Sequence, residues 1–138
     1  MIKIIGFNFN KIAIEKKKDV TNEAKISTNV DIDDVKKVNI DLFKDKDAFN
    51  IKYSLKFNYK PDFVDIEFNG NIVVLIDNSE LVKKTEEKWK SKELPLELKT
   101  HVMNIILSKC NLKALQLEEE LNVPLHMPAP RVDIQKKE

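Results

Sequence analysis

Residues 49–59 alternate without exception between apolar and polar side chains, and this pattern constrains the fold more than any other. Successive side chains of a β-strand point to opposite faces, so the pattern predicts a strand with one buried face. The apolar phase consists of Phe49, Ile51, Tyr53, Leu55, Phe57 and Tyr59. What covers this aromatic-rich face is the main functional question.

Three further segments alternate in the same way and predict strands over about 2–15, 24–33 and 63–77. A phase slip near Asn10 predicts a bulge in the first strand. Asn69-Gly70 could form a hairpin turn, but the apolar phase continues across Gly70, which favours a bulge there. We predict that residues 35–47 form a long, charged connection that could hold an edge strand of its own.

The period changes to a helical one at about Asp77. Asp77 with Glu80 resembles a capping box at the start of a helix that ends near Ser91. Pro95 is predicted at the first position of a second helix, and a separate short helix is predicted over 115–121, before Pro124. The predicted inward stripes are Leu81, Val82, Thr85 and Trp89 in the first helix and Leu98, Val102, Ile105, Ile106 and Lys109 in the second.

Strands followed by helices predict an α+β fold: a four-stranded antiparallel sheet with a long C-terminal helix and shorter flanking helices on one face. The length is that of one domain over residues 1–138. Within it we expect the sheet over 1–77, the helices over 78–122 and a proline-containing tail over 123–138, which Pro124, Pro128 and Pro130 hold extended.

The composition excludes several classes of function. The formal net charge is +1 and Arg131 is the single arginine, which weighs against specific nucleic-acid recognition. Gly6 and Gly70 are the only glycines, too few for a phosphate-cradling loop, so we expect no cofactor. A lone Cys110, no signal peptide and no long apolar run predict a cytoplasmic protein that does not insert into membranes.

The residues that could carry chemistry have structural explanations, so we do not expect an enzyme. His101 and His126 lack the further convergent ligands that a zinc site needs. Cys110 is predicted at a helix C-terminus, where the dipole does not favour a thiolate, and is expected to be a structural thiol. Residues 118–120, all glutamate, are predicted to form a solvated face.

The supply of apolar residues exceeds what the predicted helices can cover. Val73 and Leu75 lie on the phase opposite Ile72, so the fourth strand is apolar on both faces. Apolar surface on this scale is typical of a partner or subunit interface. The aromatic residues are expected to be mostly core, and the residues proposed to contact a client or partner are Phe49, Tyr53, Phe57, Phe63, Phe68, Trp89, Leu115 and Leu117.

The order of parts resembles the SecB export-chaperone family, and three short motifs support the resemblance. Residues 12–15 (Ile-Ala-Ile-Glu) look like the family's Ile-Ser-Phe-Glu at the end of its first strand. Residues 66–70 (Ile-Glu-Phe-Asn-Gly) are similar to its glycine-bulged fourth strand. Residues 108–110 and 115–117 reproduce the spacing of its Ser-Arg-Gly and Leu-Asn-Leu after the long helix.

The resemblance implies an ATP-independent holdase, a dimer or dimer of dimers, that binds unfolded polypeptides in apolar grooves between sheet and helices. A general, archaeal-type or toxin–antitoxin-linked holdase suits the sequence better than a dedicated export chaperone. Glu15 and Glu67 match acidic positions that dock the translocation motor in the family, whereas Lys11 stands where an aspartate is expected. The family's terminal helix, one wall of its groove, is cut short here by Pro124.

Two alternatives remain open from the sequence. The chain could be a non-catalytic structural or adaptor subunit that binds one folded protein partner. It could also be a small-molecule-binding or enzymatic α+β domain, which would need a deep enclosed pocket with converging polar groups.

Overall fold

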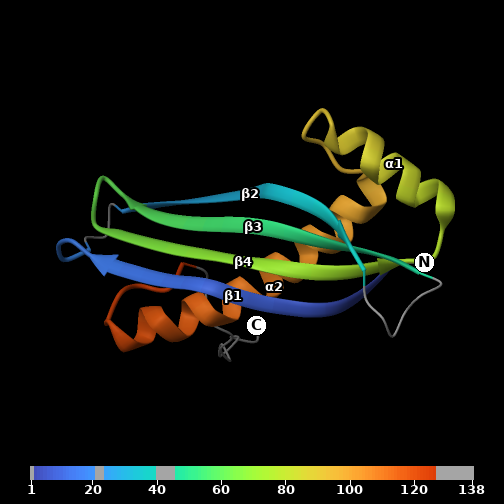
Figure 1. The fold of residues 1–138 in the computed structure, drawn as a ribbon. Coiled ribbons are helices and arrows are strands. Elements are labelled where there is room, and N and C mark those ends of the chain that lie inside the picture. Colours follow the sequence, from blue (N-terminus) through green and yellow to red (C-terminus); the bar gives the residue numbers. More distant parts are fainter. Residues whose placement is uncertain (1, 21–23, 40–45, 127–138) are drawn as a thin grey trace, which may run out of the picture.

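The computed structural model describes residues 2–20, 24–39 and 46–126 of the chain. Its elements are β1 (Ile2–Lys16), β2 (Lys25–Val38), β3 (Asp47–Lys60), β4 (Val64–Ile76), α1 (Ser79–Trp89) and α2 (Leu96–Glu120). The strands form an antiparallel sheet in the order β1-β4-β3-β2, so β1 and β2 are its edges (Figure 1). The predicted α+β class, with its four-stranded antiparallel sheet and long C-terminal helix, is confirmed.

Strand β2 continues further than the sequence pattern indicated. The register shifts between Ile32 and Asp34, after which Val35 pairs with Ile51 and the strand runs on to Val38. Because of this shift, Ile32 and Val35 face the same side of the sheet although they are three residues apart instead of two or four. The period-two pattern therefore breaks, and the sequence alone does not indicate that the strand continues. The prediction that a connection begins at Val35 is therefore wrong, and residues 40–45 of that segment lie outside the described residues.

The bulge predicted near Asn10 is confirmed, because the β1–β4 register shifts between Phe9 and Lys11. The bulge predicted at Gly70 is wrong, since β3 and β4 pair without a shift across Tyr53 and Gly70. Glycine is required there because a Cβ would lie 2.5 Å from the Tyr53 hydroxyl oxygen and still closer to the Asn8 carbonyl oxygen. Gly70 lets the bulged edge strand and the Tyr53 ring approach the β4 backbone.

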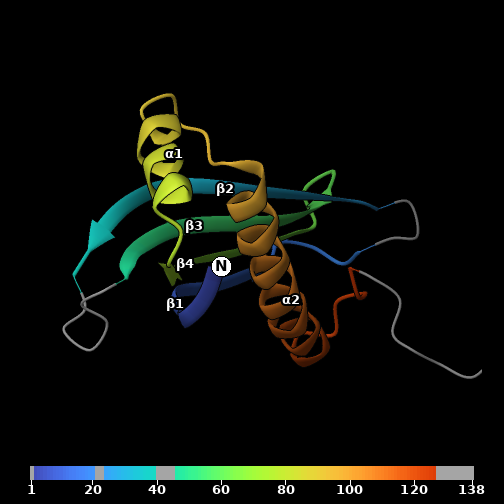
Figure 2. The same ribbon diagram turned by 90° about the vertical axis from the view of Figure 1, so that its right-hand side faces the viewer.

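Helix α2 crosses one face of the sheet obliquely, from the β2 edge to beyond the β1 edge (Figures 1 and 2). It is a single helix, so the separate short helix predicted over 115–121 is wrong, and Cys110 lies within the helix rather than at its end. No glycine or proline interrupts residues 96–120, which allows the backbone hydrogen bonds to continue. The buried stripe recurs every four residues through Leu98, Val102, Ile106, Cys110, Ala114 and Glu118.

Two details of the predicted helices need correction. Asn78, not Asp77, caps α1, and its side-chain oxygen accepts hydrogen bonds from the backbone N–H groups of Glu80 and Leu81, at 2.9 and 3.2 Å. Pro95 lies just before α2 rather than at its first position. The first predicted inward stripe is confirmed for Leu81, Val82 and Thr85, whereas Lys109 of the second stripe is exposed.

The core lies between α2 and the alternating apolar face of β3 and β4. The apolar phase of residues 49–59 is at most 2% exposed, so α2 and its neighbours cover the aromatic face within one chain. Burying a large apolar side chain stabilises a fold by roughly 1.5–3 kcal/mol, so this face accounts for much of the stability. The exposed apolar residues lie elsewhere, on α2, at the sheet edges and just past α2: Ile12, Ile26, Leu96, Leu107, Leu112, Leu121 and Leu125.

The opposite face of the sheet is polar. A chain of side-chain amides crosses three strands, because Asn10 donates to Asn71 at 3.3 Å and Asn71 donates to Asn50 at 2.9 Å. Lys11 and Glu67 form an ion pair at 3.1 Å on the same face. Apolar side chains also occur on this face, at Val73, Leu75 and Ala48, and Leu75 and Ala48 are only 2% and 1% exposed.

Candidate functional site

An open groove of about 490 Å³ lies between edge strand β2, the C-terminal end of α1 and the first turns of α2. Its apolar lining comprises Val30, Ile32, Trp89, Leu94, Leu96 and Met103, and its charged lining comprises Asp31, Lys88, Lys92, Glu93 and Lys99. Leu96 is 78% exposed at the edge of this groove. The lining is therefore mixed, with six apolar and five charged side chains.

Strand β2 supplies the groove with a backbone edge. Its partner β3 occupies one side, and among the described residues no strand pairs with the other side. An edge strand presents unpaired N–H and C=O groups that can bind an added strand, while alternate side chains enter neighbouring pockets. Val30 and Ile32 alternate on the covered face and lie beside the helices.

The turn between the helices positions the only tryptophan. The backbone N–H groups of Lys92 and Glu93 donate to the Trp89 and Lys88 carbonyls, at 2.9 and 3.1 Å, and close the end of α1. Lys92 has a φ of 61°, in the left-handed region that costs a non-glycine residue roughly 1–2 kcal/mol. This conformation places the Lys92 ammonium 5.0 Å from the centre of the Trp89 ring, a cation–π contact at the groove.

The predicted contact residues separate into two groups. Phe49, Tyr53, Phe57, Phe63 and Phe68 are buried in the core, at most 6% exposed. Trp89 lines the groove, and Leu115 and Leu117 are half-buried on α2. The role of these residues in client binding stays a prediction.

Glu15 and Glu67 lie on the polar face of the sheet, opposite the groove. Glu67 is paired with Lys11, and an exposed pair of this kind contributes roughly 0–1 kcal/mol. Their predicted part in docking a motor protein stays a prediction.

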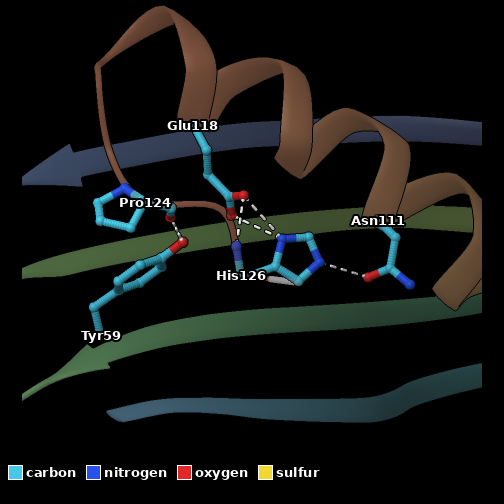
Figure 3. A network of polar contacts seen from close by, with 5 residues as sticks. All are labelled: Tyr59, Asn111, Glu118, Pro124 and His126. Atoms are coloured by element: carbon cyan, nitrogen blue, oxygen red, sulfur yellow. Dashed lines mark hydrogen bonds and ion pairs between the residues drawn. The ribbon is translucent and has the colours of Figure 1, made fainter. Parts of the chain in front are cut away.

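The sequence reasoning missed a buried polar cluster at the C-terminal end of α2 (Figure 3). Glu118 is 0% exposed, which overturns the prediction of a solvated face at that residue, and His126 is its partner. His126 Nδ1 donates to the Glu118 carboxylate at 2.9 Å, its backbone N–H donates to the same carboxylate at 2.9 Å, and Nε2 lies 2.9 Å from Oδ1 of Asn111. The i, i+4 stripe that contains Glu118 was the signal that could have revealed its burial.

Aromatic residues of β3 complete this cluster. The Phe57 and His126 rings are tilted by 33° to each other with centroids 4.3 Å apart, and the Tyr59 hydroxyl donates to the Pro124 carbonyl. Burial raises the pKa of Tyr59, and the nearby Glu118 raises it further. Burial also raises the pKa of the Cys110 thiol, to about 12, although the Tyr53 hydroxyl beside it acts in the opposite direction.

Comparison with known proteins gives a likeness of fold and no likeness of sequence. No protein-family model matches the sequence, and no curated protein matches it. The chain is similar to the Mycobacterium tuberculosis SecB-like chaperone Rv1957, solved in complex with a ChAD peptide from the Rv1956 HigA1 antitoxin. The TM-score is 0.47 and the sequence identity 7%, over 97% of this chain and 93% of that chain. At this level the likeness concerns the arrangement of the chain and says nothing of its activity.

None of the helices that the structure describes is long and apolar enough to cross a bilayer.

Proposed function

We propose that the chain is an ATP-independent, cytoplasmic holdase chaperone that binds extended segments of unfolded proteins in the groove beside β2. The open groove supports this proposal because it combines six apolar side chains with a strand edge that no described strand pairs with. Apolar side chains of a client would gain roughly 25 cal/mol per Å² removed from water, and its backbone would bond to β2. Neither contribution depends on the client's exact sequence or on nucleotide.

We also propose that the chain assembles with itself, as a dimer or dimer of dimers. Leu96 and Leu112 on α2 are 78% and 68% exposed, and Leu107 is 36% exposed. Large apolar side chains left exposed on a helix are typical of surfaces that become covered on association. Light scattering would give the mass directly, and a monomer at all concentrations would exclude this part of the proposal.

The decisive test is suppression of aggregation of a chemically unfolded client, at equal molar amounts and without nucleotide. Met103→Lys places a charge in the groove and should abolish suppression, because a client side chain would have to desolvate it. His101→Lys is the matched control, since His101 is exposed two positions earlier on the same helix. A folded wild-type chain that leaves aggregation unchanged would exclude the holdase.

Trp89 offers an independent measurement, because it is the only tryptophan and it lines the groove. Binding of a tryptophan-free client should shift the fluorescence emission of Trp89 to shorter wavelength, because the client displaces water from the indole ring.

The alternative is an adaptor that binds one folded protein. The same exposed leucines and groove would serve it. Capture of a single stoichiometric partner, without affinity for unfolded chains, would favour this second function.

A further inference from the structure

The chain after α2 turns back and covers the aromatic end of β3. We call residues 121–126 the strap. The backbone N–H of Val123 donates to the Glu118 carbonyl at 2.8 Å, and Asn122 adopts a φ of 53°, which reverses the chain direction. The reversal lets His126 reach Asn111, well back along α2 (Figure 3).

The strap is held as an extended ligand would be held. Val123 is 5% exposed, the Pro124 carbonyl accepts from Tyr59, and the side chain of His126 is 5% exposed between Glu118 and Phe57. The strap thus combines a buried apolar residue, a backbone carbonyl that accepts from Tyr59, a backbone N–H that donates to Glu118, and a buried imidazole ring.

The charge of the site specifies what kind of side chain can occupy it. The Glu118 carboxylate accepts hydrogen bonds from His126 and lies beside the Tyr59 hydroxyl, and an uncompensated buried carboxylate is strongly destabilising. The two oxygen acceptors, on Glu118 and Asn111, face opposite edges of a flat ring. A planar cation with several N–H donors fits this arrangement, and arginine carries one.

The strap and the proposed groove lie along the same stretch of β2. Phe57, under the His126 ring, pairs with Thr28 on β2, two residues before the groove residue Val30. A client strand extended along β2 from the groove therefore arrives at the strap. The exposed Ile26 lies further along the same strand.

We propose that the strap is an internal pseudo-ligand, and that when it is displaced its site binds a client segment in which an apolar residue precedes an arginine. This inference rests on the proposed holdase function and names the class of segment that the chaperone prefers. The strap occupies the site in the absence of a client, and Glu118 and Asn111 select the cation.

The test uses the full chain and three labelled peptides: acetylated, amidated Asn-Val-Pro-Leu-Arg, the same peptide with citrulline for arginine, and the same with glutamate. His126→Ala empties the side-chain site and should bind the arginine peptide about tenfold more tightly than the wild type, measured by fluorescence anisotropy. It should also prefer the arginine peptide over the citrulline peptide about tenfold, and Glu118→Gln in this background should remove that preference. His101→Ala, on the exposed side of α2, is the control and should bind as the wild type does.

A folded His126→Ala chain without this gain, or with an equal gain for citrulline, would overturn the inference. If that variant does not fold, hydrogen exchange in the wild-type chain decides. Saturation with an unfolded client should accelerate exchange of the Val123 and His126 amides, and unchanged or slower exchange would refute displacement. Suppression of aggregation by the wild type together with either negative result would leave the holdase standing and reject only the strap site.

Discussion

Substitution of Gly70 by alanine tests the packing at the centre of the sheet. An added Cβ would lie 2.5 and 2.7 Å from Oη and Cζ of Tyr53 and still closer to the Asn8 carbonyl oxygen. The Asn8 oxygen belongs to the backbone of β1 and the Tyr53 ring is 1% exposed, so neither can move freely. We expect the strands to separate locally, with loss of the Tyr53–Asn8 hydrogen bond of 3.3 Å.

The expected cost follows from these contacts. Overpacking a tight core typically costs about 1–3 kcal/mol, and the lost hydrogen bond adds about 1 kcal/mol. Replacing glycine lowers the entropy of the unfolded chain and returns about 0.4–1 kcal/mol. Gly70→Ala should therefore lower the free energy of unfolding by roughly 1–3.5 kcal/mol, with a central value of about 2 kcal/mol.

Gly6→Ala is the matched control, because a Cβ there would meet the Val73 side chain at an ordinary 3.6 Å. It should leave stability unchanged or raise it by about 0.4–1 kcal/mol. Both variants can be measured by urea unfolding, monitored by far-UV circular dichroism. If the free energy of unfolding falls by about 2 kcal/mol per molar urea, the midpoint urea concentration of Gly70→Ala should be about 1 M lower than that of the wild type. Equal midpoints for the two variants would refute the close approach described here.

Three further predictions concern helix α2 and the contacts of Asp65 in β4. Ile106→Ala should lower the free energy of unfolding, measured by urea titration, by about 2–5 kcal/mol, because Ile106 is 0% exposed. Leu112→Ala, at a 68% exposed position, should change it by less than about 0.5 kcal/mol. Similar values for the two variants would contradict the assignment of Ile106 to the buried face of α2. Cys110, buried and with its pKa raised to about 12, should resist a thiol reagent at pH 8 until the chain unfolds, so rapid reaction of the folded protein would count against its burial. Hydrogen bonds from Lys17 and Asn58 lower the pKa of the Asp65 carboxyl in the folded chain. A carboxyl whose pKa is lower in the folded than in the unfolded chain adds stability above the unfolded pKa, so the wild type should be more stable than Asp65→Asn at about pH 6, and this difference should shrink as the pH falls below about 4. A difference that does not depend on pH would refute the pairing.

The strands were predictable because their periodicity is local. A residue alternates between faces whatever lies on either side, so residues 49–59 could be assigned to a one-sided strand without knowledge of its neighbours. The phase slip near Asn10 was visible for the same reason. The slip after Ile32 was missed because charged residues surround it, and only pairing with Ile51 shows that Val35 continues the strand.

The sequence predicted that the chain has an apolar binding surface, but it did not predict where in the fold that surface lies. The excess of apolar residues indicated a binding surface, and the aromatic strand was its expected centre. In the structure those aromatic rings are core, because α2 crosses their face, and the groove lies at the β2 edge instead. The direction in which a helix crosses a sheet depends on side-chain packing between distant segments, which no local pattern contains.

By itself, the sequence determined the α+β class and the order of strands and helices along the chain, since both follow from local periodicity. The tertiary structure alone decided that Glu118 is buried and that His126, which the sequence left without a role, is its partner. The physical reason is that the burial of a charge is set by the groups that surround it in space. Here those groups are Asn111 on the same helix, Tyr59 and Phe57 on a strand, and the strap that returns to meet them.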